Sequence, residues 1–299
     1  MKKSFENLHR LVKNARKGII GLVGAAAPEV LRAARMAVEE DAAVPILIGN
    51  TNKMREIAAA EHLDLDGIRT EHAEDDPEAA FIAMEMVRNG EVGALLKGRI
   101  LTRILMKEGY RKGLRRDGRL MSHVTLIEVP RFKKPILVTD SALTPYPTFE
   151  QRIQIIKNAV DVMRRLGVEE PRVAILSASE EINDKIPCSL DAARLADLNL
   201  PGGELESFGI IEGPLDLGCA LDEETARIKG VSTNVAGKVD ILVAPDIVSA
   251  NLLSKSLIYL ADGQVAACVV GGTVPIGMVS RASPAKDKYN ALLLTMACR

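Results

Sequence analysis

The feature that most constrains the fold is a regular alternation of short apolar runs with amphipathic segments. In the first half, strands are expected at 19–25, 44–49, 92–96, 124–129 and 135–138, and helices at 28–40, 52–63, 77–89 and 100–107. Strands that alternate with helices in this way predict an α/β fold whose sheet is mostly parallel and covered on both faces.

A second series begins after the turn-rich segment Thr144-Pro145-Tyr146-Pro147. Its strands are expected at 173–176, 208–211, 239–243, 265–270 and 274–279, and its helices at 149–166, 189–198, 249–260 and 289–296. The strand at 208–211 is expected to end at Glu212-Gly213-Pro214. The two series predict two α/β domains with a cleft between them.

The composition excludes several classes of function. The chain has 299 residues, a net charge of −1, 3% aromatic residues and no Trp, so neither a basic field nor stacking residues favour a nucleic-acid partner. Its four cysteines form no Cys-x-x-Cys pair, so we expect reduced core thiols and no metal site. We find no membrane span and no signal peptide, so we expect a cytoplasmic protein.

The segment from Ser280 to Asn290 has the outline of an anion-handling site. Ser283 can cap the helix that follows, and Pro284 suits its first position. One buried stripe is expected at Ala285, Tyr289, Leu292, Leu293 and Met296. Asp287 then lies off that face, near Ser280 and Arg281, so a hydroxyl, a cation and a candidate base meet where a strand ends. The alternative is a capped helix in which Arg281 pairs with Asp287.

Other polar clusters also follow expected strands, where ligands of α/β proteins bind. Lys97-Gly98-Arg99 with Thr102 opens a helix and suits a phosphate, although a lysine after a strand is often only solvated. Thr139-Asp140-Ser141 and Ser177-Ala178-Ser179 are candidate ligand contacts or ordinary turns. Asp246, followed by Asn251 and Lys255, is favoured as a helix cap, and His123 as a structural histidine. No dinucleotide, P-loop or nucleophile-elbow motif occurs.

Several segments of the chain match those of a known family. The matching segments are Leu96-Lys97-Gly98 with Thr102, 118–123, 128–130, 138–140, 212–215, 235–237, Pro245-Asp246 with Asn251 and Lys255, and Val274-Pro275-Ile276 running into Ser280-Arg281. In these segments the chain resembles the phosphate acetyltransferase and phosphate butyryltransferase family over essentially its whole length, and it looks closest to the butyryltransferase branch.

The resemblance implies a fold similar to that of the isocitrate and isopropylmalate dehydrogenases. Two α/β domains would flank an active-site cleft. The first would comprise 1–143 and 270–299, and the second, inserted domain would comprise 144–269. Homodimers or larger assemblies are also implied.

The resemblance further implies a reversible reaction in which acyl-CoA and phosphate give acyl phosphate and free CoA through a ternary complex. Asp287 would be the general base, Arg281 would bind the phosphoryl group, and Ser280 would hydrogen-bond the developing oxyanion or the thioester sulfur. Substrate contacts would come from Lys97, Gly98, Arg99, Thr102, Thr139, Asp140, Asp246 and Asn251. CoA would be a substrate, with no metal and no cofactor.

Two departures bear on the acyl group. The acetyltransferase branch usually has Gly-Cys after Ser-Arg, whereas this chain has Ala282-Ser283, and that branch's additional arginine has no clear counterpart. Lys97 or Arg99 would then supply the second cation. The differences favour a butyryl or similar acyl group over acetyl. The alternatives are a phosphate acetyltransferase, a non-catalytic relative that binds CoA or acyl phosphate, and a metal-dependent dehydrogenase on the related fold.

Overall fold

The computed structural model describes residues 5–299, which divide into two compact units. The first unit holds the chain through Met121 and again Gln264–Arg299, and the second holds Ser122–Gly263. These boundaries differ from the expected ones. Residues 122–143 fall in the second unit because β5 (Ser122–Glu128) pairs with β6 (Ile136–Thr139), and β6 pairs in turn with β9 (Ile241–Val243).

The first unit is built on strands in the order β3-β2-β1-β4-β11-β10. Their bounds are β1 Ile19–Val23, β2 Val44–Gly49, β3 Arg69–His72, β4 Ala94–Lys97, β10 Gln264–Val270 and β11 Ile276–Gly277. All neighbours are parallel except β10 and β11, which are antiparallel. The central strands β1 and β4 read as continuous apolar runs because side chains on both of their faces are buried.

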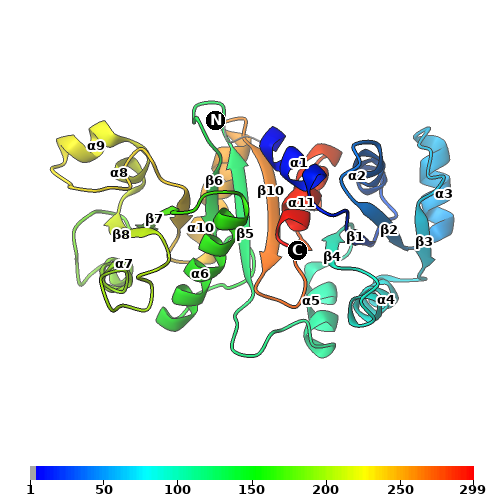
Figure 1. Cartoon of the computed structure of the whole chain (residues 1–299), viewed down its shortest axis with the longest axis horizontal. Coiled ribbons are helices and arrows are strands. Elements are labelled where there is room, and N and C mark those ends of the chain that lie inside the picture. The colour runs from blue at the N-terminus through cyan, green and yellow to red at the C-terminus, as the bar shows by residue number, and fades with distance from the viewer. Residues whose placement is uncertain (1–4) are drawn as a thin grey trace. The chain divides into compact units, whose positions relative to one another are not determined.

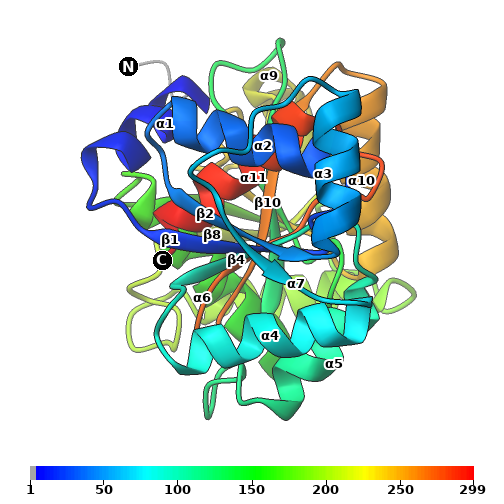
Figure 2. The ribbon, with the colours of Figure 1, turned by 90° about the vertical axis from the view of Figure 1, so that its right-hand side faces the viewer.

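Helices cover both faces of this unit (Figures 1 and 2). They are α1 Phe5–Asn14, α2 Pro28–Glu39, α3 Thr51–Ala60, α4 Asp76–Arg88, α5 Thr102–Arg111 and α11 Ala285–Ala297. Figure 2 shows α1, α2 and α11 above the strands and α4 and α5 below them. The C-terminal helix α11 packs against α2, α1 and β10, and its residues 288–296 are all buried.

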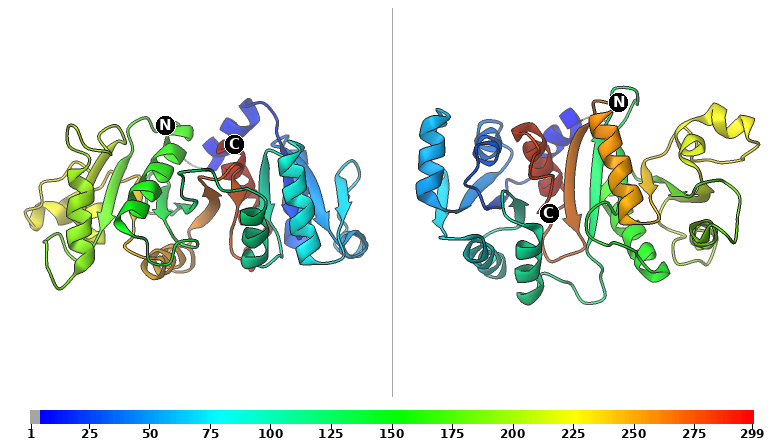
Figure 3. Two further views of the ribbon diagram at one scale, coloured as in Figure 1. Left: turned by 90° about the horizontal axis from the view of Figure 1, so that it is seen from below. Right: turned by 180° about the vertical axis from the view of Figure 1, so that it is seen from behind.

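The second unit has strands in the order β5-β6-β9-β7-β8, of which only β5 and β6 are antiparallel. Its remaining elements are β7 Arg172–Leu176, β8 Ile210–Leu215, α6 Phe149–Arg165, α7 Pro187–Asp197, α8 Leu217–Leu221, α9 Glu223–Ile228 and α10 Ile247–Tyr259. Helices α6 and α10 both pack on β5 and β6, from opposite faces (Figure 3). A capping box formed by Thr148 and Gln151 begins α6.

The mostly parallel α/β class is therefore confirmed, with differences in individual elements. The strand expected at 274–279 is only two residues long as β11, whereas β8 continues through Glu212-Gly213-Pro214 to Leu215. The elements α1, β3, α8 and α9 were not expected. Among residues 5–299, no helix combines the length and apolar character that a membrane span requires.

Candidate functional site

In the first unit, the candidate site begins where parallel strands end side by side. Val23 at the end of β1 lies opposite Lys97 at the end of β4. β11 runs parallel to β4 on its other side, with Gly277 opposite Leu96. The loop that carries Ser280 and Arg281 starts just after β11, so sheet topology brings it to the same edge as Lys97.

Gly98 fixes the path of the chain after β4. Its amide donates to the carbonyl of Val23 at 2.8 Å, and the next amide donates to the carbonyl of Gly24 at 2.9 Å. A β-carbon at position 98 would lie only 2.4 Å from the Gly24 carbonyl oxygen. Only glycine allows this approach, so Gly98 positions the residues on either side of it.

Lys97 is a buried lysine, with 4% of its surface exposed. Its ammonium donates to two carbonyl oxygens, those of Gly98 at 3.3 Å and Ile100 at 3.1 Å. Burial, together with the positive charges of Lys288 and Arg281, lowers the pKa of Lys97 to about 8. Lys97 is therefore not the solvated lysine of the alternative interpretation.

Ser280 and Arg281 are both exposed, in the loop between β11 and α11. The Ser280 hydroxyl accepts a hydrogen bond from the Ala282 amide at 3.4 Å. Among the described residues, no carboxylate forms an ion pair with Arg281, so the expected alternative of an Arg281–Asp287 pair is not found. Without an ion pair to a carboxylate of residues 5–299, the guanidinium remains able to bind an anion from solution.

Asp287 lies in the first turn of α11 and is partly buried. Burial raises the pKa of its carboxyl above the ordinary value, against opposing effects from the Val265 backbone, the Lys288 charge and the Ser283 hydroxyl. The residue that caps α11 is Pro284, without a side-chain cap, so the prediction that Ser283 caps this helix is wrong. Ser283 instead interacts with Asp287.

Lys288 is a residue of this site that the sequence analysis missed. Its side chain is completely buried, and its ammonium donates to the Ser280 carbonyl at 3.3 Å. Burial lowers its pKa, and the charge of Arg99 acts in the same direction. A signal was present in the sequence, because Lys288 lies three residues after Ala285 and four before Leu292, within the stripe expected to be buried.

Arg99 and Thr102 lie at the outer side of this cluster. Arg99 is exposed and forms an ion pair with Glu29 of α2 at 3.2 Å. Thr102 is the first residue of α5, whose N-cap residue Leu101 supplies no side-chain bond. Arg99 is thus already engaged by a carboxylate, whereas Lys97 forms no ion pair with a carboxylate in the described part of the chain.

The predicted substrate contacts of the second unit have protein partners in the structure. Thr139 is fully buried and donates to the His123 carbonyl at 3.0 Å. Asp140 is 4% exposed, and its carboxylate accepts three backbone amides, those of Ala142, Leu143 and Thr144, at 2.9–3.3 Å. These bonds hold a turn together, and a substrate role for either residue stays a prediction.

A buried polar network adjoins this turn. The Ser141 hydroxyl lies 3.0 Å from His123 Nδ1 and 2.7 Å from the Thr125 hydroxyl. Asn251 of α10 donates to the Ser141 carbonyl at 3.0 Å. These contacts agree with the structural interpretation of His123.

Asp246 caps a helix, as the sequence analysis favours. It is the N-cap residue of α10, and its carboxylate accepts the Ser249 amide at 2.8 Å.

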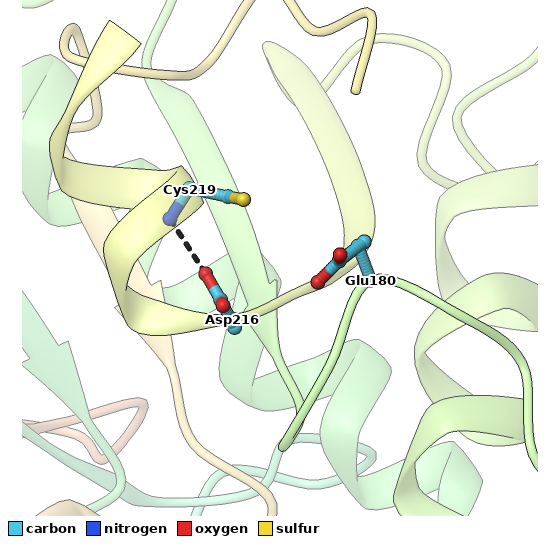
Figure 4. Close-up of side chains that lie close together, drawn as sticks. All are labelled: Glu180, Asp216 and Cys219. Carbon is cyan, nitrogen blue, oxygen red and sulfur yellow. Dashed lines mark hydrogen bonds between the residues drawn. The ribbon is translucent and has the colours of Figure 1, made fainter. Parts of the chain in front are cut away.

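One set of side chains in the described part of the chain has metal-ligating geometry. Figure 4 shows Glu180, Asp216 and Cys219, whose candidate ligand atoms all lie within 4.8 Å of one another. Lys229, however, forms ion pairs with both carboxylates, and burial raises the pKa of the Cys219 thiol to about 11. A thiolate is the form that binds metals, and the raised pKa keeps this thiol protonated. We therefore interpret the set as an ion-pair cluster around Lys229.

Comparison with known proteins establishes the family. Residues 74–296 match the model of the phosphate acetyl/butaryl transferase family, and the chain belongs to this family.

Two relatives and one solved structure illustrate the relationship. The chain is 34% identical to a phosphate butyryltransferase of Clostridium acetobutylicum over 98% of this chain and 97% of the relative. It is 36% identical to a phosphate acetyltransferase of Thermotoga maritima over 96% of this chain and 98% of the relative. A branched-chain phosphotransacylase from Enterococcus faecalis V583 superposes with a TM-score of 0.81 at 31% identity, covering 93% of this chain and 98% of that one.

Proposed function

We propose that the protein is an acyltransferase that moves an acyl group reversibly between CoA and inorganic phosphate. The observation that carries the proposal is the arrangement in the first unit. There, the buried ammonium of Lys97 and the unpaired guanidinium of Arg281 accompany Asp287, a carboxyl whose pKa burial raises. Cations that bind phosphate and a strengthened base are the two groups that this reaction needs.

In the acyl-CoA-forming direction, the Asp287 carboxylate takes the proton of the CoA thiol. The thiolate attacks the carbonyl carbon of the acyl phosphate, the new C–S bond forms, and the C–O bond to phosphate breaks. Phosphate leaves with the electron pair of that bond, and the proton on Asp287 is then released to it or to water. In reverse, phosphate attacks the thioester and protonated Asp287 returns the proton to the leaving thiolate.

The other residues stabilise charge during these steps. Arg281 offers a planar set of donors to the phosphoryl oxygens, and Lys97 adds a second positive charge. Ser280 donates its hydroxyl proton to the developing oxyanion or the sulfur. Because both substrates are bound together, positioning supplies a further part of the rate, and no acyl-enzyme forms.

The acyl group is proposed to be butyryl or a similar short chain. The Ala282-Ser283 pair favours this choice over acetyl, and the relatives include both butyryl- and acetyltransferases at similar identity. The test is phosphate-dependent release of free CoA from acetyl-, butyryl- and isobutyryl-CoA. A higher kcat/KM for butyryl- or isobutyryl-CoA than for acetyl-CoA is expected, and the reverse order would make the protein an acetyltransferase.

The same assay decides between an enzyme and a non-catalytic binding protein. If no acyl-CoA of any chain length releases CoA in a phosphate-dependent way, the acyltransferase proposal is wrong. We propose that the reaction requires no metal and no cofactor, with CoA entering as a substrate, because Lys97, Arg281 and Asp287 supply the charges and the base. Activity that disappears with a chelator and returns with a divalent cation would contradict this.

A homodimer or larger homo-oligomer is proposed from an exposed apolar stripe on α10. Val248, Leu252 and Tyr259 are 51%, 61% and 68% exposed and recur at helical spacing, and Leu260 beside them is 85% exposed. A stripe of this kind suits a second copy of the same helix. Light scattering on the wild type and on Leu252→Glu tests this, because the substitution is expected to lower the oligomeric state.

A further inference from the structure

Among residues 5–299, Lys288 is one of the largest fully buried side chains, and it is the only charged one in that group. Burying an ammonium costs free energy unless a carboxylate or another anion compensates it. Lysine is therefore almost never fully buried without a partner. The position of Lys288 thus calls for a compensating negative charge.

The protein supplies little of that charge. The ammonium has three donors, and its one hydrogen bond in the described structure is to the neutral Ser280 carbonyl. No carboxylate of residues 5–299 forms an ion pair with it. Glu29 and Asp287 are close enough to raise its pKa, but Glu29 is already paired with Arg99.

The neighbouring positive charges increase the need for a compensating negative charge. Lys97 is also buried, and the positive charges of Lys288 and Arg281 act on it. Its hydrogen bonds within the described part of the chain go to carbonyl oxygens. Three cations from β4, the loop after β11 and α11 thus lie together, and the charges that oppose them are Glu29 and Asp287 near Lys288 and Asp76 near Lys97. This arrangement is suited to a bound dianion, because its negative charge would offset the repulsion among the three cations.

We propose that Lys288 is a positioning residue of the phosphate subsite. Its buried charge lies beneath the Ser280–Arg281 loop, holds the Ser280 carbonyl, and together with Lys97 and Arg281 attracts a phosphoryl dianion. This inference rests on the proposed acyl transfer, and it adds a third cation, from α11, to Arg281 and Lys97. Arg99, one of the two residues expected in that role, is exposed and occupied by Glu29.

Phosphate oxygens come from two sources, inorganic or acyl phosphate and the phosphate groups of CoA. The observations favour the first. Lys288 is completely covered and Lys97 nearly so, and a small anion at the Ser280–Arg281 loop fits such a site better than a nucleotide.

The test compares Lys288→Met with the control Lys286→Met, which removes an exposed lysine from the same helical turn. In Lys288→Met we expect the KM for phosphate to rise about tenfold or more, the KM for acyl-CoA to stay within about twofold, and most of the thermal stabilisation by inorganic phosphate to disappear. The control should behave like the wild type. An unchanged phosphate KM and thermal shift in Lys288→Met, or a loss of the response to CoA instead, overturns the proposal.

A charge effect is separated from a packing effect by the pH profile. With Lys288 neutralised, Lys97 loses a repulsive neighbour, so the alkaline rise of the phosphate KM should move to higher pH. An unmoved profile would contradict the proposal. Should Lys288→Met fail to fold, Lys288→Gln keeps a donor for the Ser280 carbonyl without the charge, and the same results are expected.

The thermal shift also separates this inference from the proposed reaction. If the wild type turns over no acyl-CoA but its stabilisation by phosphate depends on Lys288, the reaction is wrong and the subsite stands. If the wild type is active and Lys288→Met keeps its phosphate KM and thermal shift, only the inference about Lys288 is wrong.

Discussion

The ammonium of Lys288 lies 3.3 Å from the carbonyl oxygen of Ser280, eight residues earlier in the chain. This contact ties the helix that carries Asp287 to the loop that carries Arg281. The candidate base and the candidate phosphate ligand are therefore held by one short segment around a buried positive charge. Their relative position depends on α11, which is packed against α2 and β10 along most of its length.

Replacing Asp287 with asparagine should lower kcat about a hundredfold or more, because the amide cannot accept the thiol proton. The KM values should change little, since asparagine has the same shape. Burial raises the pKa of Asp287, so in the acyl-CoA-forming direction, where the carboxylate is the base, the wild-type kcat should fall on the acid side of a midpoint above that of a free aspartate. Steady-state rates across pH test both points, and activity within a few-fold of the wild type would remove Asp287 as the base.

Ser283→Ala is the matched control for Asp287. Ser283 interacts with the Asp287 side chain and lowers its pKa. Its removal should raise that pKa slightly and move the acid limb of the kcat profile to higher pH, while kcat at its plateau stays within a few-fold of the wild type. A large loss of kcat in this variant would show that Ser283 has a role of its own.

The pKa of Lys97, lowered to about 8 by burial, predicts how phosphate binding depends on pH. Below this pKa the ammonium is charged, so the phosphate KM should be low there and should rise as the pH increases through about 8. The stability of the free protein should also rise with pH in this range, although phosphate binding weakens. The pKa lies below the ordinary value of 10.5, so the unfolded chain binds more protons between these values and stability rises with pH.

Lys97→Met tests this assignment. The variant should have a raised phosphate KM at neutral pH and no rise near pH 8, while the KM for acyl-CoA is retained. A profile that keeps the wild-type rise would show that another group titrates there. Initial rates at several phosphate concentrations across pH 6.5 to 9.5, about the range spanning this pKa, give the measurement.

Much of the fold could be predicted because periodicity and turn residues act locally. The runs at 19–25, 44–49 and 92–96 become β1, β2 and β4 within a few residues. The boundary between the units could not be read in this way. It depends on the pairing of β6 with β9, which lies about 100 residues further along the chain.

The site could be predicted in its residue types but not in its electrostatics. Lys97, Ser280, Arg281 and Asp287 stand out because they follow strands, and the structure gathers them in one unit. Which cations can bind a phosphate depends on their burial and ion pairs. Both depend on packing between elements that are distant in the sequence. Arg99 forms an ion pair with Glu29 of α2, whereas Lys288, for which the spacing within the apolar stripe is the one signal in the sequence, is fully enclosed.

Asp140→Ala should destabilise the second unit. The carboxylate accepts the amides of Ala142, Leu143 and Thr144, and its removal leaves three backbone donors without their partner. A loss of about 2 kcal/mol or more in the free energy of unfolding is expected. Asp140→Asn keeps the Oδ1 acceptor for two of the three amides and should lose less, and chemical denaturation measures both.

The same pair of variants tests whether Asp140 also contacts substrate. If its role is confined to the turn, Asp140→Asn should retain the wild-type KM for phosphate and acyl-CoA at a temperature where it is folded. A KM raised about tenfold in a folded Asp140→Asn protein would establish the predicted substrate contact.

Gly98→Ala should damage the site without removing any of its functional groups. The added β-carbon would lie 2.4 Å from the Gly24 carbonyl oxygen and 2.9 Å from that of Val23, both rigid backbone atoms at the end of β1. The chain must therefore move away, which should cost about 1–3 kcal/mol of stability and displace Lys97. Thermal unfolding and the phosphate KM are the measurements. Gly218→Ala, where the nearest atom is a Thr225 methyl at 3.3 Å, is the control and should have little effect on either. Unchanged stability and an unchanged phosphate KM in Gly98→Ala would mean that the close approach to β1 does not position Lys97.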